Sequence, residues 1–359
     1  MDRRHFLMSS VAASASLRPS MLASPNDTVR VACVGFHGQG RAHISGYLRL
    51  PNVELAALCD VDEAVLEDGM KLVEKAGKKR PAGYTDFRKL LEDKSIDAVS
   101  LATPNHQHTL QTIWACQAGK DVYVEKPCSH NMFEARQIVA ASRKYNRIVQ
   151  HGTGASASLH EAAQKIREGI IGEAYMARGL CFKIRDTIGR TPEESDPPGV
   201  HYDLCLGPAP KRRFTKNRFH YNFHWFWDYG CGDIGNDGIH QIDQARWGLG
   251  VGLPNAVSAS GGQLFYEDDH ETPDTQVVTY EYDDCYLLYE MRLWTDYPLE
   301  GHDNGVIFYG DNGKLEIGRN GCDVIMKGGE KKHLGPYADI KDHFRNFLGC
   351  VKAGTPEAL

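Results

Sequence analysis

The sequence predicts a two-domain α/β protein, with a parallel α/β domain over residues 27–151 and an α+β domain over residues 152–359. The first region alternates short apolar runs with longer segments of helical period, which is typical of a parallel sheet covered on both faces. The second region carries runs of strands without helices between them, which favours an open, mostly antiparallel sheet. A length of 359 residues also suits two domains, at roughly 150 residues each.

The first domain is expected to alternate strand and helix throughout. Its expected strands are 29–34, 53–59, 98–102, 122–124 and 148–149. Its expected helices are 41–50, 63–76, 87–93, 109–118 and 132–145. Such alternation places the strands side by side in one direction, with the helices as crossovers.

The second domain is expected to begin with a helix at 159–168 and a strand at 174–182. A loop rich in proline, glycine and arginine follows over 186–217, and a second helix is expected near 238–247. The remaining expected strands are 256–260, 276–282, 286–293, 306–309 and 314–317, before a last helix at 340–352.

Composition excludes several classes of protein. Lys and Arg number 41 against 47 Asp and Glu, a net charge of −6, so a polybasic nucleic-acid-binding surface is not expected. No run reaches the ~18 apolar residues that a membrane span needs, so membrane insertion is not expected either. The ten cysteines lack the close spacing of zinc sites, and no metal site is expected.

Residues 1–24 resemble a twin-arginine export signal, because Arg3 and Arg4 precede a run of small and apolar residues. The other interpretation is an N-terminal arm with two incidental arginines. An export signal predicts a periplasmic or secreted protein. Since this export route carries folded proteins, a cofactor would be bound before export.

Residues 35–40 read Gly-Phe-His-Gly-Gln-Gly and lead from the first expected strand into a helix. This is the context of a dinucleotide-binding fingerprint. Gly35 and Gly40 fit the G-x-G-x-x-G spacing, but His37 takes the middle position and Gly38 comes one step late. An ordinary glycine-rich turn is the alternative.

Asp60 strengthens the nucleotide interpretation, because it ends the second expected strand 20 residues beyond Gly40. A carboxylate there accepts hydrogen bonds from a ribose 2′-hydroxyl. Asp60 and Asp62 would also repel a 2′-phosphate, so NAD is predicted in preference to NADP. The alternative role of Asp60 is to cap the next helix.

Three further motifs carry a family resemblance: Thr-Pro-Asn-His-Gln-His at 103–108, Glu-Lys-Pro at 125–127 and Gly-Asp-Ile-Gly-Asn-Asp-Gly-Ile-His-Gln-Ile-Asp at 232–243. Together they resemble the Gfo/Idh/MocA oxidoreductases, the family of glucose–fructose oxidoreductase and inositol dehydrogenase, over residues 28–352. The resemblance implies a Rossmann domain that binds NAD, and a second domain whose open sheet forms a homo-oligomer. Relatives continue beyond the last expected helix, so a truncated C-terminus is also an expectation.

The resemblance implies that Lys126 is a catalytic residue facing the nicotinamide and that His240 is a second one. Independently, oxidation of a hydroxyl needs a base within about 3 Å, and a desolvated lysine supplies a neutral amine. Asn236 stands where sugar and inositol dehydrogenases commonly carry aspartate, and an amide cannot take a proton. Proton transfer would therefore depend on Lys126 and His240, with Asn236 orienting a hydroxyl.

The remaining candidates surround these residues. Thr103, Asn105, His108 and Glu125 are expected to contact the cofactor, although Glu125 at a strand end has a purely structural alternative. An aromatic segment at 223–229 and a neighbouring carboxylate are expected to bind substrate through Trp225, Trp227, Asp228 and Asp237, because apolar sugar faces stack on such rings. Core packing or a subunit contact is the alternative for the aromatic residues.

The expected function is NAD(H)-dependent oxidation of a carbohydrate or polyol hydroxyl with a tightly bound, internally recycled cofactor. An exported enzyme meets little free NAD, which is why recycling is expected. One alternative is an NAD-dependent glycoside hydrolase or lyase that oxidises its substrate transiently. Another is a non-catalytic, NAD-dependent sugar sensor, for which Lys126 would be dispensable.

Overall fold

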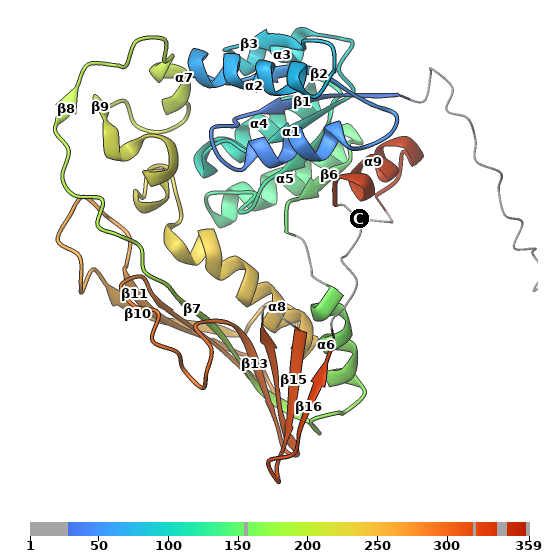
Figure 1. Cartoon of the computed structure of the whole chain (residues 1–359), viewed down its shortest axis with the longest axis vertical. Coiled ribbons are helices and arrows are strands. Elements are labelled where there is room, and N and C mark those ends of the chain that lie inside the picture. The colour runs from blue at the N-terminus through green and yellow to red at the C-terminus, as the bar shows by residue number, and fades with distance from the viewer. Residues whose placement is uncertain (1–27, 154–156, 319–320, 336–342, 357–359) are drawn as a thin grey trace, which may run out of the picture.

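The computed structural model describes residues 28–153, 157–318, 321–335 and 343–356. They form a layered α/β half with a broad second sheet below it (Figure 1). The predicted export signal lies outside the described residues. Among the described helices, none has the length and apolar character that crossing a membrane would require.

The first half contains a parallel sheet of six strands in the order β3-β2-β1-β4-β5-β6. The strands are β1 (Val29–Val34), β2 (Val53–Cys59), β3 (Ala82–Tyr84), β4 (Ala98–Leu101), β5 (Asp121–Val124) and β6 (Val149–His151). Only the short β3 was absent from the expected set. The strand order reverses between β1 and β4, and such a reversal opens a ligand crevice at the carboxyl ends of the strands.

Helices cover this sheet on both faces: α1 (Gly40–Leu48), α2 (Glu63–Lys75), α3 (Phe87–Glu92), α4 (Asn105–Gln117) and α5 (Met132–Tyr145). Polar side chains start several of them. Asp62 accepts hydrogen bonds from two amides of α2, and Asn131 accepts one from Glu134 in α5. These caps satisfy amides that the first helical turn leaves without partners.

The second half is built on an eight-stranded sheet in the order β10-β11-β12-β7-β13-β14-β15-β16. Its strands are β7 (Ala174–Phe182), β10 (Ala256–Gly262), β11 (Thr275–Glu281), β12 (Tyr286–Arg292), β13 (Asn304–Gly310), β14 (Gly313–Gly318), β15 (Gly321–Met326) and β16 (Lys331–Leu334). All neighbours run antiparallel except β12 and β7. This confirms the expected open, mostly antiparallel sheet.

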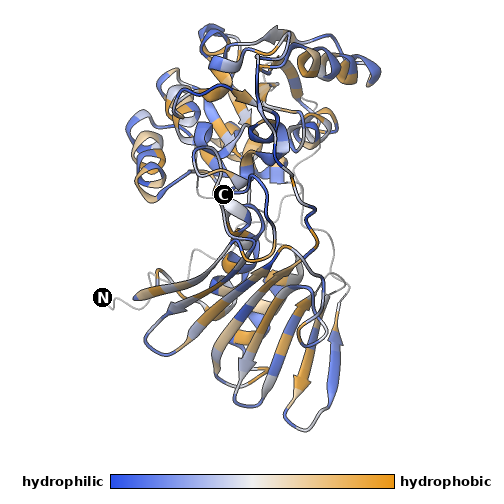
Figure 2. Ribbon diagram, turned by 90° about the vertical axis from the view of Figure 1, so that its left-hand side faces the viewer, coloured by the Kyte–Doolittle hydropathy of each residue, from blue (hydrophilic) through white to orange (hydrophobic). Residues whose placement is uncertain are grey.

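Helices α6 (Ala157–Arg167) and α8 (Ile239–Leu249) pack on one face of this sheet. Leu287, Tyr289 and Met291 of β12 point to that face and are at most 1% exposed, as the period of two in a strand requires. No helix of the described part of the chain lies in front of the opposite face (Figure 2).

Between β7 and α8 the chain leaves the sheet and crosses to the first half, where α7 (Tyr202–Leu206) lies beside the parallel sheet and its helices (Figure 1). Two short strands, β8 (Glu193–Glu194) and β9 (Phe214–Thr215), pair within this excursion. It also contains the 3₁₀ turns η2 (Lys216–Arg218) and η3 (His220–Trp225).

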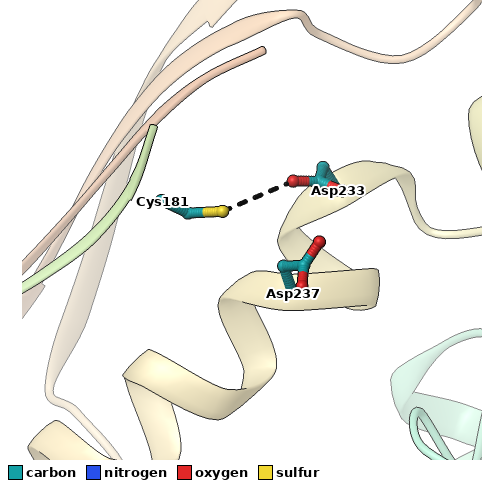
Figure 3. A group of neighbouring side chains, drawn as sticks. All are labelled: Cys181, Asp233 and Asp237. Carbon is teal, nitrogen blue, oxygen red and sulfur yellow. Dashed lines mark hydrogen bonds between the residues drawn. The ribbon is translucent and has the colours of Figure 1, made fainter. Parts of the chain in front are cut away.

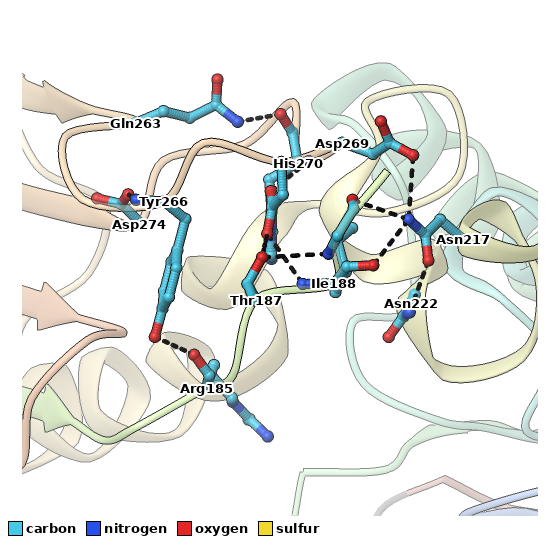
Figure 4. Close-up of polar contacts among 12 residues, drawn as sticks. Arg185, Thr187, Ile188, Asn217, Asn222, Gln263, Tyr266, Asp269, His270 and Asp274 are labelled. Carbon is cyan, nitrogen blue, oxygen red and sulfur yellow. Dashed lines mark hydrogen bonds and ion pairs between the residues drawn. The ribbon is translucent and has the colours of Figure 1, made fainter. Parts of the chain in front are cut away.

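Polar contacts fix the base of this excursion to the loop before β11 (Figure 4). The Asn217 amide donates to the carbonyl oxygens of Ile188 and Gly189 and to Asp269. The Tyr266 hydroxyl donates to the Arg185 carbonyl oxygen. The loop expected at 186–217 is therefore a hydrogen-bonded structure with a defined path.

The last helix, α9 (His343–Ala353), returns to the first half. Its Phe347 is fully buried in a core that includes Val31 of β1 and Ile44 and Tyr47 of α1. By packing, α9 belongs to the first half, although the sequence analysis placed all of 152–359 in the second domain. Helical period identifies an apolar face but does not say which partner covers it.

Candidate functional site

A cavity of about 790 Å³ lies between the two halves, at the carboxyl ends of the parallel strands. The first half contributes the glycine turn 35–39, residues 59–61, 85–88, 102–108 and 110–111, Trp114, Glu125 and Lys126. The chain between β7 and α8, which crosses to the first half and is termed the crossing segment, contributes 203–205, 207–208, 218–221, 223–224, Tyr229 and Asn236. Its place at the strand-order reversal is the place where α/β sheets bind dinucleotides.

The glycine turn has the shape that a diphosphate needs. Gly35 has a φ of +73°, and a Cβ there would lie 2.8 Å from Thr103 Cγ2. A Cβ on Gly40 would lie 2.1 Å from the Gly35 carbonyl oxygen, so both positions require glycine. Gly38 faces open space, which lets a ligand approach the backbone at the start of α1.

Asp60 lines the cavity, and both of its carboxylate oxygens accept backbone hydrogen bonds. Phe36 N donates to Oδ2 at 2.9 Å and Asp62 N donates to Oδ1 at 3.1 Å. Burial raises the pKa of Asp60 to about 6, although these amides oppose the rise. A carboxylate oxygen has two acceptor sites, so Asp60 retains capacity for ribose hydroxyls.

Polar atoms around the cavity fit a bound dinucleotide. Asn105 Oδ1 and His108 Nε2 are buried and have no hydrogen-bond partner among the residues that the structure describes, and buried polar atoms are rarely left without one. Their orientation is fixed in part, since His108 Nδ1 lies 2.7 Å from the Pro127 carbonyl oxygen. Thr103 Oγ1 donates to Gln111 Oε1 at 2.8 Å.

Lys126 extends from the end of β5 to the second half of the chain. Its Nζ donates to the Asn236 carbonyl oxygen at 2.6 Å and to Asn236 Oδ1 at 3.0 Å. Burial lowers the pKa of Lys126, and the charges of Glu125 and Asp237 oppose that change. The amine therefore loses its proton more readily than an exposed lysine does.

The Glu125 carboxylate contacts a buried histidine that the sequence analysis did not name as a candidate. His43 Nε2 of α1 lies 3.0 Å from Glu125 Oε1, and the Lys126 amide donates to Oε2 at 3.0 Å. Burial raises the pKa of Glu125, but His43 and Lys126 outweigh it, and the net shift is downward. The ionised carboxylate thus fixes the backbone of Lys126.

The sequence analysis expected a helix near 238–247, and the structure adds a π-helical turn, η4 (Ile234–Gly238), directly before α8. Asp237 turns toward β7 and its extension, where its Oδ2 lies 2.5 Å from Lys183 Nζ and 2.7 Å from Arg185 Nη2. Although burial opposes it, the Lys183 hydrogen bond lowers the pKa of Asp237 to about 2. π-turns often occur at functional sites.

His240 is the second residue of α8 and is not part of the cavity lining. Burial lowers its pKa, and the nearby Lys126 charge adds to the effect. His240 is therefore neutral around pH 7 and close enough to Lys126 to sense its charge.

Cys181, Asp233 and Asp237 lie together (Figure 3), with one ligand-type atom from each within 4.8 Å of the others. The carboxylates already have cationic partners, because Lys183 contacts Asp237 and Arg185 contacts both. Burial raises the pKa of the Cys181 thiol to about 12, whereas metals bind the thiolate. The cluster is a charge-balanced polar core.

None of the predicted substrate residues lines the cavity. Trp225 is only 2% exposed and packs in the core of the second half, so its ring face is not open to a sugar. Trp227 is 53% exposed, and Asp228 forms an ion pair with Arg212. The Phe, Tyr and Trp residues that line the cavity are Phe219, Tyr221, Phe223 and Tyr229, together with Phe36, Phe87 and Trp114 of the first half.

Comparison with known proteins identifies both halves. Residues 29–153 match the oxidoreductase family model with an NAD-binding Rossmann fold, and residues 179–352 match that family's C-terminal alpha/beta domain. Solved structures agree in fold. The WlbA dehydrogenase from Bordetella pertussis, in complex with NADH and UDP-GlcNAcA, has a TM-score of 0.69 at 21% identity, covering 92% of this chain and 90% of that one.

A second solved structure is the aldose-aldose oxidoreductase from Caulobacter crescentus complexed with glycerol, with a TM-score of 0.69 at 19% identity and coverage of 91% and 90%. Curated relatives include a glycosyl hydrolase family 109 protein of Shewanella pealeana, 28% identical over 201 residues, which are 48% of this chain and 44% of the relative. An alpha-N-acetylgalactosaminidase of Shewanella oneidensis is 28% identical over 202 residues, with the same coverage.

The chain thus spans less than half the length of the curated relatives it matches. The two family models together cover most of its own length, and they confirm the fold class and NAD as the cofactor. The chain belongs to the Gfo/Idh/MocA family of NAD-dependent oxidoreductases.

Proposed function

We propose that the protein oxidises a hydroxyl of a carbohydrate or polyol, with Lys126 as the general acid and base. The observation that carries this proposal is the half-buried Lys126 amine at the cavity, whose hydrogen bonds within the described residues go to the neutral Asn236. NAD, when bound, supplies the acceptor for the hydrogen and electron pair that leave the carbon. Lys126 takes the hydroxyl proton, and its lowered pKa favours that transfer.

Asn236 and His240 assist Lys126 in different ways. The Asn236 amide holds the amine at the cavity and can orient a hydroxyl, but it does not titrate. His240 is neutral around pH 7, because burial lowers its pKa, and it is the second group able to accept a proton. Asp60 would hold the ribose, and its charge favours NAD over NADP.

The surroundings of the amine suit a cofactor that stays bound. Residues 203–208 and 218–224 of the crossing segment face the glycine turn across the cavity, so release of a dinucleotide would require this segment to move. We propose that the cofactor is recycled within each catalytic cycle, as an enzyme exported through residues 1–24 would require. Fractionation of cells that express the full chain checks the export step.

A second candidate is a glycosidase or lyase that oxidises its substrate transiently. The curated relatives named as glycosyl hydrolase family 109 proteins favour it, as does the non-titrating Asn236. A ketone on the sugar acidifies the neighbouring C–H bond, Lys126 or His240 removes that proton, and the glycosidic oxygen leaves. In a glycosidase, water then adds across the carbon–carbon double bond that the elimination leaves, whereas a lyase keeps that bond. Reduction of the ketone leaves no net redox change.

The test compares wild type with Lys126→Met, which replaces the amine with an apolar group of similar length. Holoprotein is incubated with aldoses, polyols and aryl glycosides while absorbance near 340 nm and released phenol are followed. With no second substrate to reoxidise the bound cofactor, net oxidation raises the absorbance, and redox-neutral cleavage releases phenol without that rise. The variant should lose at least about 10³-fold in rate, and full retention of either activity would refute the role of Lys126.

A further inference from the structure

His37 departs from the dinucleotide fingerprint, since it takes the position that the second glycine holds elsewhere. The structure places this histidine in the lining of the cavity, within the glycine turn. Its ring stacks on His220, with 3.7 Å between the ring centroids and an angle of 20° between the planes. The two histidines come from opposite halves of the chain, so their contact spans the entrance to the glycine turn.

His220 is held in an unusual conformation. Its φ of +49° lies in the left-handed region, which few residues other than glycine adopt. The Phe219 ring lies 3.9 Å from the His220 ring, and Nε2 is 3.6 Å from Asp62 Oδ2. Local strain of this kind persists only where surrounding contacts maintain it, and it concentrates at functional sites.

The segment that carries His220 is fixed to the first half by backbone hydrogen bonds. His201 N donates to the Val61 carbonyl oxygen at 2.9 Å, and Glu63 N donates to the Gly199 carbonyl oxygen at 2.9 Å. The Gln107 side chain donates to the Leu204 carbonyl oxygen at 2.9 Å. The position of His220 opposite the glycine turn is therefore set by the chain, and does not depend on the ring stack alone.

The ligand group that belongs at this place is the diphosphate of the dinucleotide. Backbone N–H groups at the start of α1 attract phosphate oxygens, and the two imidazoles lie at the same turn. We propose that His37 and His220 form a diphosphate-binding pair that donates hydrogen bonds to the phosphate oxygens from both halves of the chain. The pair takes over part of the role of the missing glycine, and it joins the bound diphosphate to the crossing segment.

The charges around His220 predict that binding takes up a proton. Burial chiefly, and then the charge of His37, lower the pKa of His220 to about 4, while Asp62 on α2 opposes this. His220 is thus neutral at pH 7 in the free protein. A diphosphate favours the imidazolium form, so its arrival raises that pKa, and affinity falls as the pH rises above the pKa in the complex.

The test measures binding and not turnover. Full-length protein freed of nucleotide is titrated at pH 6 and pH 8 with NAD, with ADP-ribose, which keeps the diphosphate, and with adenosine, which lacks it. His37→Gln and His220→Gln are compared with His333→Gln, an exposed histidine that pairs with Asp323 on the far sheet. Release of NAD from the holoprotein is timed for each variant.

At pH 6, His37→Gln and His220→Gln should each lower the affinity for NAD and ADP-ribose by about tenfold and speed the release of NAD. The affinity for adenosine should not change. The ratio of NAD affinity at pH 6 to NAD affinity at pH 8 should become smaller. The His37 ring is exposed, so its loss cannot unfold the core. Unchanged NAD affinity in His37→Gln would therefore overturn the proposal. An equal loss for adenosine would also overturn it. Neither result bears on sugar oxidation, which the binding titration does not involve.

Discussion

At the scale of single residues, the charge state of Lys126 depends on the group that faces it. Its Nζ contacts the Asn236 carbonyl and side-chain oxygens, and both are neutral. A carboxylate at position 236 would favour the ammonium form and raise the pKa of the lysine. Asparagine at this position therefore preserves the lowered pKa that burial produces. The departure from the family pattern thus favours Lys126 as a base.

The same reasoning predicts the effect of Asp237→Asn. The charge of Asp237 raises the pKa of Lys126. Loss of that charge also releases the Lys183 cation from its ion pair with Asp237, and the Lys183 charge lowers the pKa of Lys126. Both changes favour the neutral amine, so the acidic limb of the kcat/KM profile for sugar oxidation should move to lower pH, by about 0.5 to 1 unit. A pH profile of kcat/KM from pH 5 to 10 checks this.

Asp68→Asn on the exposed side of α2 is the matched control, because Asp68 contacts only Lys71 among the described charges and lies outside the cavity. Its profile should match that of wild type. A limb that moves to higher pH in Asp237→Asn would mean that the charge at 237 does not act on Lys126 as the geometry implies.

At the scale of elements, α9 packs against the first half and stabilises it, although the first half is the part of the chain most distant from α9 in sequence. Phe347 is fully buried among residues of β1 and α1, and the Phe344 ring lies 4.7 Å from that of Tyr47. Phe347→Ala should lower the free energy of unfolding by about 3 to 5 kcal/mol, since it removes buried apolar surface and leaves a cavity. Denaturant titration followed by tryptophan fluorescence measures the change.

Phe133→Ala provides the matched control for this prediction. Phe133 lies in α5 of the same half, but its side chain is 71% exposed, so its removal should change stability by less than about 0.5 kcal/mol. If the two variants were equally stable, α9 would not be part of the core of the first half.

The elements that could be predicted from sequence are those with strong apolar patterns. The expected strands at 29–34, 53–59 and 174–182 coincide with β1, β2 and β7. The short β3 and the strands β15 and β16 were not expected, because they contain glycine and lysine and lack a long apolar run. The π-helical turn was also missed, since sequence period alone does not distinguish it from regular helix.

At the scale of the whole molecule, the site combines what sequence could and could not predict. Lys126 and the glycine turn were predictable, because each follows directly from a strand end. Glu125 contacts His43, which is 82 residues away in sequence. His37 contacts His220, which lies on the opposite half of the chain. Such pairs depend on how the halves meet, which no local pattern encodes.

The open face of the eight-stranded sheet is where we propose that copies of the chain associate. Val277 and Tyr286 on this face are 37% and 52% exposed, and Leu288 of β12, the strand between β11 and β7, lies on the same side. Exposed apolar surface on a sheet is costly in water, and a second copy would cover it. Light scattering after size exclusion should therefore give a mass above the 40.0 kDa of one chain.

Val277→Asp combined with Tyr286→Asp should shift that mass to a single chain, because two unpaired carboxylates would be buried at each contact. Val139→Asp is the matched control, since Val139 is 48% exposed on α5 of the other half, and the same change of side chain there should leave the mass unaltered. A wild-type mass of one chain, or an assembly that persists in the double variant, would locate the contact elsewhere. Retained NAD binding in the double variant would show that the first half folds and holds its cofactor without the partner.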